Sequence, residues 1–223
     1  MTTTLATPAV TATLGRMFAA AAHDDASPLL PGGAFATASA LEKADAAQDT
    51  YMPISPEAGQ LLYALVRASR PETVVEFGTS FGISTIHLAA AVTDNGTGHV
   101  VTTELSTAKV KAAQSNLEQA GVGAAVTILA GDARQTLAGV PGPIGLVLLD
   151  GWKDLCLPVL RLLEPRLAPG ALVAGDDSSF PSMADYLDYV RDPANGYVSV
   201  SFPVEDGMEI SCWTGTPAPT ARS

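Results

Sequence analysis

The sequence predicts one doubly wound α/β domain built on a mostly parallel sheet of seven strands. The first sign is a set of five mainly apolar runs that alternate with helical segments, because continuous apolar runs of this length are typical of strands buried on both faces of a parallel sheet. The runs are residues 73–77, 99–103, 126–130, 144–149 and 171–174, and the helical segments are residues 83–93, 106–120, 132–138 and 152–167. The second sign is a pair of later strands, at 197–202 and 208–214, that flank the turn residues Glu205, Asp206 and Gly207. This pair predicts an antiparallel edge, and the whole pattern is Rossmann-like.

The elements before the sheet predict a helical cap over residues 1–50. Two Ala-rich segments, residues 12–23 and 34–46, read as helices. The loop between them contains Pro28, Pro31, Gly32 and Gly33.

The α/β core is expected to occupy residues 51–214. It opens with Ser55, Pro56 and Glu57, which supply an N-cap, a proline at the first helical position and an acid in the first turn. They start a helix that runs to about Ser69, and a last helix lies near residues 182–190. Residues 215–223 are expected to form a tail, so residues 1–223 make a single domain.

Composition favours a small-molecule ligand. The 223 residues carry a formal net charge of -11 and a pI near 4.5, which argues against nucleic acid, whose phosphates attract Lys and Arg. No apolar run reaches membrane-spanning length, and the Ala-rich start is interrupted by Arg16 and lacks a basic leader, so we expect a cytoplasmic protein without membrane contact. Cys156 and Cys212 lack a zinc motif and are expected to be buried, reduced thiols.

A nucleoside-type cofactor site is predicted at three successive strand ends. Glycines Gly78 and Gly82 lie between the first strand and its helix, where backbone can approach a ligand and helix N–H groups are free. Glu104 ends the next strand, where an acid can accept both hydroxyls of a ribose. The third strand ends at Gly131, Asp132 and Ala133, which we expect to line an adenine. The alternative is a glycine turn with a surface Glu and a helix-capping Asp.

Two cofactor classes fit this loop, S-adenosylmethionine and NAD(P). A dehydrogenase prefers Gly-x-Gly-x-x-Gly for the pyrophosphate, whereas Ser80 stands at the middle position here. A Tyr-x-x-x-Lys pair for hydride chemistry is also absent from the sequence. A carboxylate such as Glu76 would repel a pyrophosphate but would accept the amino group of a methionine moiety. These features favour S-adenosylmethionine.

The fourth strand ends in an electrostatically unusual segment. Asp150, Gly151, Trp152, Lys153 and Asp154 follow the run 144–149, and Lys153 stands in the first helical turn. The helix dipole disfavours a cation there by a few tenths to about 1 kcal/mol. A residue that is locally unfavourable, at the carboxyl end of a strand, indicates a functional site. The alternative is a surface lysine whose stem covers Trp152.

These residues resemble the small class I O-methyltransferases of the catechol O-methyltransferase type, from about Met52 to Trp213. The most specific match is Asp150-Gly151-Trp152-Lys153-Asp154, close to the family's Asp-His-Trp-Lys-Asp. Supporting matches are Val75-Glu76-Phe77-Gly78, Thr102-Thr103-Glu104, Ala174-Gly175-Asp176-Asp177 and Asp206-Gly207. The resemblance implies S-adenosylmethionine as cofactor, a small aromatic acceptor and, by analogy with bacterial relatives, a possible homodimer.

The resemblance also assigns roles to residues. Met52 would lie near the sulfonium, Glu104 on the ribose, and Ala133 and Trp152 near the adenine. The residues expected to bind the cofactor are Met52, Glu76, Gly78, Ser80, Ser84, Glu104, Asp132, Ala133, Asp150 and Trp152. Asp150, Asp176 and Asp177 match the metal ligands, and Trp152 and Pro181 would line the acceptor pocket.

Strand order supports a metal at these aspartates. Asp150 ends one strand, and Asp176 and Asp177 end the next, so three oxygen donors can converge at one edge of the sheet. Oxygen ligands suit Mg²⁺, with Ca²⁺ or Mn²⁺ as substitutes. The alternative is a polar turn that caps the helix near Pro181.

The expected reaction follows from these parts. The metal would hold two adjacent acceptor oxygens, and Lys153, its pKa lowered by burial and by the cation, would accept the proton of the reacting hydroxyl. The chain departs from the family at Val200, which replaces a Glu that binds the second catechol hydroxyl, and at Thr50, which replaces a gate Trp. A metal-independent methyltransferase acting on another oxygen or on nitrogen, and a nicotinamide oxidoreductase, remain the alternatives.

Overall fold

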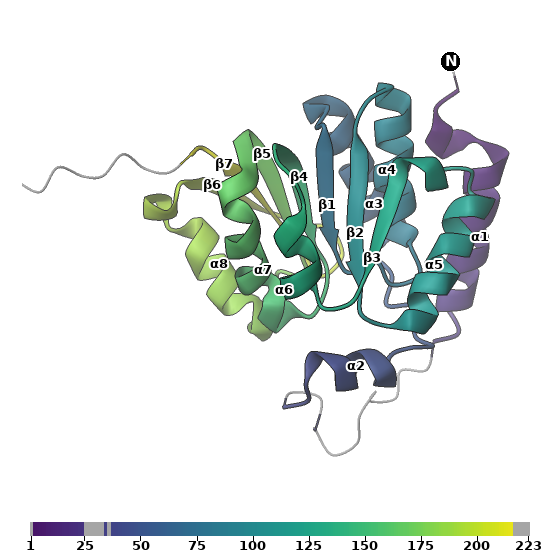
Figure 1. Ribbon diagram of the computed structural model, residues 1–223, viewed down its shortest axis with the longest axis horizontal. Helices are drawn as coiled ribbons and strands as arrows, with labels where there is room; N and C mark the ends of the chain where they lie inside the picture. Colours follow the sequence, from purple (N-terminus) through teal and green to yellow (C-terminus); the bar gives the residue numbers. More distant parts are fainter. Residues whose placement is uncertain (1, 25–33, 35–36, 216–223) are drawn as a thin grey trace, which may run out of the picture.

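The computed structural model describes residues 2–24, 34 and 37–215, and its core is a seven-stranded sheet of order β3-β2-β1-β4-β5-β7-β6 (Figure 1). The strands are β1 (Thr73–Phe77), β2 (His99–Glu104), β3 (Val126–Ala130), β4 (Ile144–Leu149), β5 (Leu167–Asp176), β6 (Tyr197–Phe202) and β7 (Met208–Trp213). Strands β1 to β5 pair in parallel, and β7 runs antiparallel to both β5 and β6. The predicted fold class is confirmed, with the β6–β7 hairpin forming the antiparallel edge.

Helices cover both faces of the sheet (Figure 1). The helices are α1 (Pro8–Ala21), α2 (Ala40–Ala46), α3 (Pro56–Ser69), α4 (Ile83–Asn95), α5 (Thr107–Gln119), α6 (Ala133–Thr136), α7 (Cys156–Leu163) and α8 (Ala184–Arg191). One apolar core joins α1, α3, α4 and α5 to the sheet, and a second joins α6, α7 and α8 to its other face. Strand order reverses between β1 and β4, so their carboxyl ends open the crevice in which α/β proteins bind ligands.

Local sequence explains where several helices begin. The Ser55 side chain accepts the N–H of Ala58 and Pro56 occupies the first turn, as predicted for the start of α3. Helix α1 begins earlier than expected because Thr7 caps it. Helix α2 begins later than the expected residue 34, because Ser39 and Glu42 form a capping box.

The expected helix over residues 152–167 is broken. A 3₁₀ turn, Lys153–Leu155, precedes α7, and Leu167 already belongs to β5, which pairs with Ile144 of β4 through an irregular register. The lysine predicted in a first helical turn therefore begins a 3₁₀ turn.

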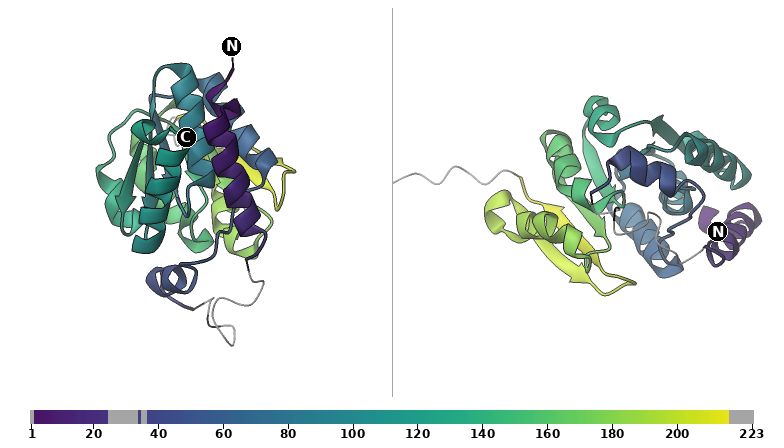
Figure 2. Two further views of the ribbon diagram at one scale, coloured as in Figure 1. Left: turned by 90° about the vertical axis from the view of Figure 1, so that its right-hand side faces the viewer. Right: turned by 90° about the horizontal axis from the view of Figure 1, so that it is seen from below.

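The two helices predicted as an N-terminal cap, α1 and α2, lie at different parts of the sheet. Helix α1 packs on the core through Val10, Leu14 and Met17. Helix α2 lies across the carboxyl edge of the sheet (Figure 2). Four residues of the expected loop between the two helices, Pro28, Pro31, Gly32 and Gly33, lie outside the described residues.

The structure bears on two expectations from composition, which concern membrane-spanning helices and the two cysteines. In the part of the chain that the structure describes, no helix is long and apolar enough to cross a membrane. Both cysteines are free thiols, but Cys212 is only half-buried, which corrects the expectation that both are buried. Its strand, β7, lies next to the outermost strand β6, where cover is incomplete.

Candidate active site

A cavity of about 800 Å³ opens at the carboxyl ends of β1, β2, β4 and β5. Most of the residues predicted for the site line it: Met52, Gly78, Ser80, Glu104, Asp132, Ala133, Asp150, Trp152, Lys153, Asp176 and Asp177. A small adjoining pocket includes Ser84. The predicted metal and catalytic residues and most of the predicted cofactor residues thus share one site, whereas Glu76 lines neither pocket.

The glycine loop after β1 brings backbone close to the strand end of β4. Gly78 has a φ of 103°, and a Cβ there would lie 2.6 Å from the carbonyl oxygen of Asp150. The Asp150 N–H also donates to the carbonyl of Phe77 at 2.9 Å. Gly82, with a φ of 94°, then starts α4, whose first N–H groups are available for a ligand.

Glu76 is fully buried beneath this loop. Its Oε2 accepts hydrogen bonds from Thr85 Oγ1 at 2.5 Å and Thr102 Oγ1 at 2.6 Å, whereas Oε1 has no hydrogen-bond partner among the described residues. Burial raises the pKa of Glu76 to about 7, although the hydroxyls of Ser84, Thr102 and Thr85 act to lower it. A buried carboxylate with a free oxygen fits an amino group such as that of a methionine moiety.

Glu104 and Asp132, the residues predicted for the ribose and the adenine, are both held by local contacts. Glu104 accepts the N–H of Ser80 on Oε2 and the N–H of Ser106 on Oε1, both at 2.8 Å, which fixes its carboxylate at the cavity wall. Asp132 caps α6 and pairs with Arg134 at 2.6 Å. This capping role is the alternative foreseen for Asp132, and it coexists with a place on the cavity wall.

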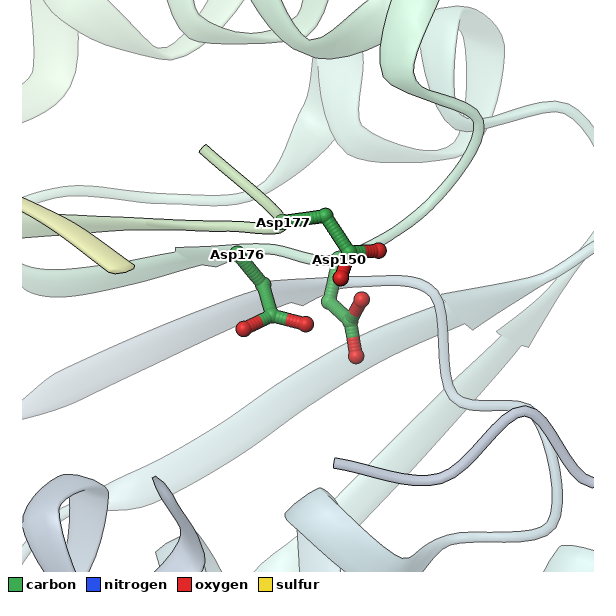
Figure 3. A group of neighbouring side chains, drawn as sticks. All are labelled: Asp150, Asp176 and Asp177. Carbon is green, nitrogen blue, oxygen red and sulfur yellow. The ribbon is translucent and has the colours of Figure 1, made fainter. Parts of the chain in front are cut away.

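Three carboxylates converge at the ends of β4 and β5 (Figure 3). One oxygen each of Asp150, Asp176 and Asp177 lies within 4.8 Å of the others. Asp177 has a φ of 56°, a left-handed conformation in the turn that follows β5. Burial raises the pKa of Asp150, and burial together with the charges of Asp150 and Asp177 raises that of Asp176 to about 9. Such repulsion is relieved by a cation.

Lys153 lies against this cluster. Its Nζ is 3.0 Å from Asp150 Oδ1 and 2.9 Å from Asp177 Oδ2. Burial lowers the pKa of Lys153, but the charges of Asp150 and Asp177 outweigh it, so the pKa is raised above its ordinary value. The two carboxylates that contact the ammonium group thus raise its pKa in the protein alone, and the lowered pKa expected with a bound cation stays a prediction.

The donor set fits a hard divalent cation. Three carboxylates face a single ammonium group, which leaves negative charge uncompensated in a largely buried site. Carboxylate oxygens are the ligands that Mg²⁺ and Ca²⁺ prefer. Asp150, Asp176 and Asp177 are the residues that would hold such an ion.

The acceptor end differs in part from the expectation. Trp152 lines the cavity as predicted, but Phe180 and Ser182 line it in place of the exposed Pro181 between them. Val200, at the position of the family's glutamate, is 60% exposed on the edge strand β6 and does not line the cavity. Acidic groups of the β6–β7 turn, Glu205 and Asp206, also line the cavity wall.

Two lysines of the cavity wall were not predicted. Lys43 of α2 is buried and pairs with Asp154 at 3.1 Å, and Lys109 of α5 is buried with Nζ 3.2 Å from Ser80 Oγ. Neither lies at a strand end, where the sequence search looked for chemistry. In an amphipathic helix, the sequence pattern does not show that one particular lysine is buried.

Comparison with known proteins points to one family. A family profile described as a methyltransferase domain matches residues 75–178. The chain is 30% identical to catechol O-methyltransferase B of Danio rerio over 178 residues, which cover 74% of this chain and 66% of that protein. It is 36% identical to catechol O-methyltransferase of Mycobacterium tuberculosis over 143 residues, which cover 64% of each chain. The chain thus spans about two thirds of the length of these relatives.

A solved structure agrees with these relatives. The O-methyltransferase TomG of Streptomyces achromogenes, in complex with SAM, is 26% identical, with a TM-score of 0.64 over 80% of this chain and 91% of that one.

Proposed function

The chain belongs to the class I, S-adenosylmethionine-dependent O-methyltransferases of the catechol O-methyltransferase type, and from this premise we propose that it methylates a hydroxyl of a small, catechol-like aromatic in a divalent-metal-dependent reaction. The matched relatives are named catechol O-methyltransferases, and TomG was solved with SAM. The metal, the acceptor and the roles of single residues are the proposed parts. The homodimer stays a prediction.

One observation carries the proposal: the cofactor loop and the carboxylate cluster meet at Asp150. The Gly78 backbone packs against the carbonyl of Asp150, while the Asp150 side chain joins Asp176 and Asp177. A ligand on the glycine loop and an acceptor on the carboxylates would therefore be neighbours in one cavity. Group transfer gains much of its rate from such alignment.

In the proposed methyl transfer, the bound cation and cofactor would supply the reactive groups, and the protein side chains would orient them. A divalent cation would hold two adjacent acceptor oxygens and acidify the reacting hydroxyl, and S-adenosylmethionine would supply the methyl group. The protein would orient them: Glu104 would offer its carboxylate at the cavity wall and Glu76 from beneath the glycine loop, while Met52 and Trp152 line the cavity. Helix α2 lies across the edge of the sheet (Figure 2), and its residues Ala40, Lys43 and Ala44 line the cavity.

Lys153 would receive the proton of the reacting hydroxyl at Nζ. A lysine can accept a proton only in its neutral form, and the charges of Asp150 and Asp177 keep it protonated. Base catalysis by Lys153 therefore requires that the charge of these carboxylates is compensated. This requirement supports metal dependence over the metal-independent alternative.

Calorimetric titration tests the cofactor and metal. We expect S-adenosylmethionine and S-adenosylhomocysteine to bind, NADH not to bind, and Mg²⁺ to bind the wild-type protein but not an Asp176→Asn variant. Binding of NADH alone would refute the cofactor assignment, and equal Mg²⁺ binding by both proteins would refute the metal site.

A further inference from the structure

Lys109 is a buried lysine to which neither the proposed reaction nor the comparisons assign a role. It is 3% exposed, and it lies on α5 at the wall of the cavity. Lysines are rarely buried unless they are paired. Burial lowers the pKa of Lys109, while the charges of Glu104 and Asp24 raise it, so nearby carboxylates offset part of the cost of burial.

The hydrogen bonds of Lys109 lead to the chain segment that joins the cap to the core. Lys109 Nζ donates to Ser80 Oγ at 3.2 Å, and Ser80 Oγ donates to the carbonyl oxygen of Tyr51 at 2.8 Å. The N–H of Tyr51 donates to Asp24 Oδ2 at 2.7 Å. Both backbone polar groups of Tyr51 are therefore held by side chains that come from distant parts of the chain.

Ring contacts strengthen the same connection. The ring of Tyr51 stacks on that of Phe81 at a centroid distance of 4.1 Å, and Lys109 Nζ lies 5.3 Å from the centroid of the Phe81 ring. A cation near an aromatic face is attracted by the ring electrons, and more strongly where water is excluded. Lys109 therefore contacts both residues, Ser80 and Phe81, on which Tyr51 rests.

Two residues with a left-handed backbone conformation lie in or next to this connection. Ser80 has a φ of 47° and Met52 has a φ of 44°, left-handed conformations that are unfavourable for a non-glycine residue. Such conformations persist where surrounding contacts hold them. Met52 follows Tyr51 directly and lines the cavity together with Gly78 and Ser80.

We infer that Lys109 is a positioning residue of the transfer site: through Ser80 it holds the carbonyl of Tyr51, and thereby Met52, against the cofactor loop. The part that concerns methyl transfer rests on the proposed function, because it takes the neighbouring cavity as the cofactor site. The relay itself, Lys109 to Ser80 to Tyr51, belongs to the protein without ligands.

Hydrogen exchange of the cofactor-free protein, followed by mass spectrometry, tests the relay directly. In Lys109→Met and in Ser80→Ala, we expect exchange in peptides that contain Tyr51 and Met52 to rise by about tenfold, the effect of losing one charge-assisted or neutral hydrogen bond. The double variant should add little to either single change, because both break the same relay. Lys111→Met, an exposed lysine on the same helix, is the matched control and should leave exchange unchanged.

Three outcomes would overturn the inference. They are unchanged exchange at Tyr51, additive effects in the double variant, and a rise spread evenly over α5 and the sheet, which would mean general destabilisation. If Lys109→Met does not fold, hydrogen exchange at Tyr51 in Ser80→Ala alone tests the relay. Titration with S-adenosylhomocysteine adds a second readout: affinity should fall about tenfold in Lys109→Met but not in Lys111→Met. If the wild-type protein fails to bind this ligand, the proposed function fails, while the exchange result still tests the relay.

Discussion

Replacing Glu76 by Gln should make the protein more stable at pH 8 while leaving its stability at low pH nearly unchanged. The glutamine keeps the size of the side chain and an oxygen that can accept from Thr85 and Thr102, but it removes the charge. The gain at pH 8 would reflect the cost of burying an ionised carboxylate whose second oxygen lacks a partner among the described residues.

The magnitude follows from the pKa of Glu76. The value is 4.5 in an unfolded chain and about 7 in the folded protein. The folded state therefore holds the proton more tightly, so stability falls as pH rises from 4.5 to 7 and is constant above 7. The rise in pKa corresponds to about 3 kcal/mol in the free energy of unfolding at pH 8, and to less than about 1 kcal/mol at pH 5.

Chemical denaturation at pH 5 and pH 8 measures this difference. The free energy of unfolding of Glu76→Gln should exceed that of the wild type at pH 8, and this difference should be about 2 kcal/mol larger at pH 8 than at pH 5. Glu118→Gln, which changes an exposed glutamate of α5, should show no such pH-dependent gain. An equal effect of Glu76→Gln at both pH values would refute the argument from burial.

Three further substitutions test the site. Lys153→Met should lower turnover by about 10²-fold with S-adenosylhomocysteine affinity unchanged, and near-normal turnover in a kinetic assay would exclude Lys153 as the base. Asp150→Asn should remove the stimulation of turnover by Mg²⁺, and a normal response to the metal would contradict its role as a ligand. Gly78→Ala should lower the melting temperature and weaken cofactor binding, because its Cβ would meet the Asp150 carbonyl at 2.6 Å, whereas Gly15→Ala, with open space around it, should do neither.

The sequence predicted the sheet because its strands are long apolar runs whose burial on both faces leaves a clear pattern. Helix boundaries near the site were less accurate. The 3₁₀ turn at Lys153–Leu155 and the early start of β5 depend on pairing between Leu167 and Ile144, which is a tertiary contact. Helix α1 was expected in the cap, but its apolar side packs on the core.

The site residues that could be predicted from the sequence are those at the ends of strands. Glu104, Asp150 and Asp176 each end or follow a strand, and parallel strands bring their carboxyl ends to one edge. Lys109 and the raised pKa of Lys153 were not predictable, because both depend on which side chains meet in space. Helical spacing gives no sign that Lys109 reaches Ser80, and the local motif does not show that Asp177 turns back onto Lys153.

A methyl-transfer assay with a matched pair of acceptors tests whether the protein methylates adjacent aromatic oxygens in a metal-dependent reaction. Catechol and phenol would be incubated with S-adenosylmethionine and the purified protein, with Mg²⁺ or with a chelator. We expect methylation of catechol in Mg²⁺, its loss with the chelator, and little reaction of phenol, because phenol offers one oxygen to a site with three converging carboxylates. Chelator-insensitive methylation would refute the metal dependence, and equal rates for both acceptors would refute recognition of two adjacent oxygens.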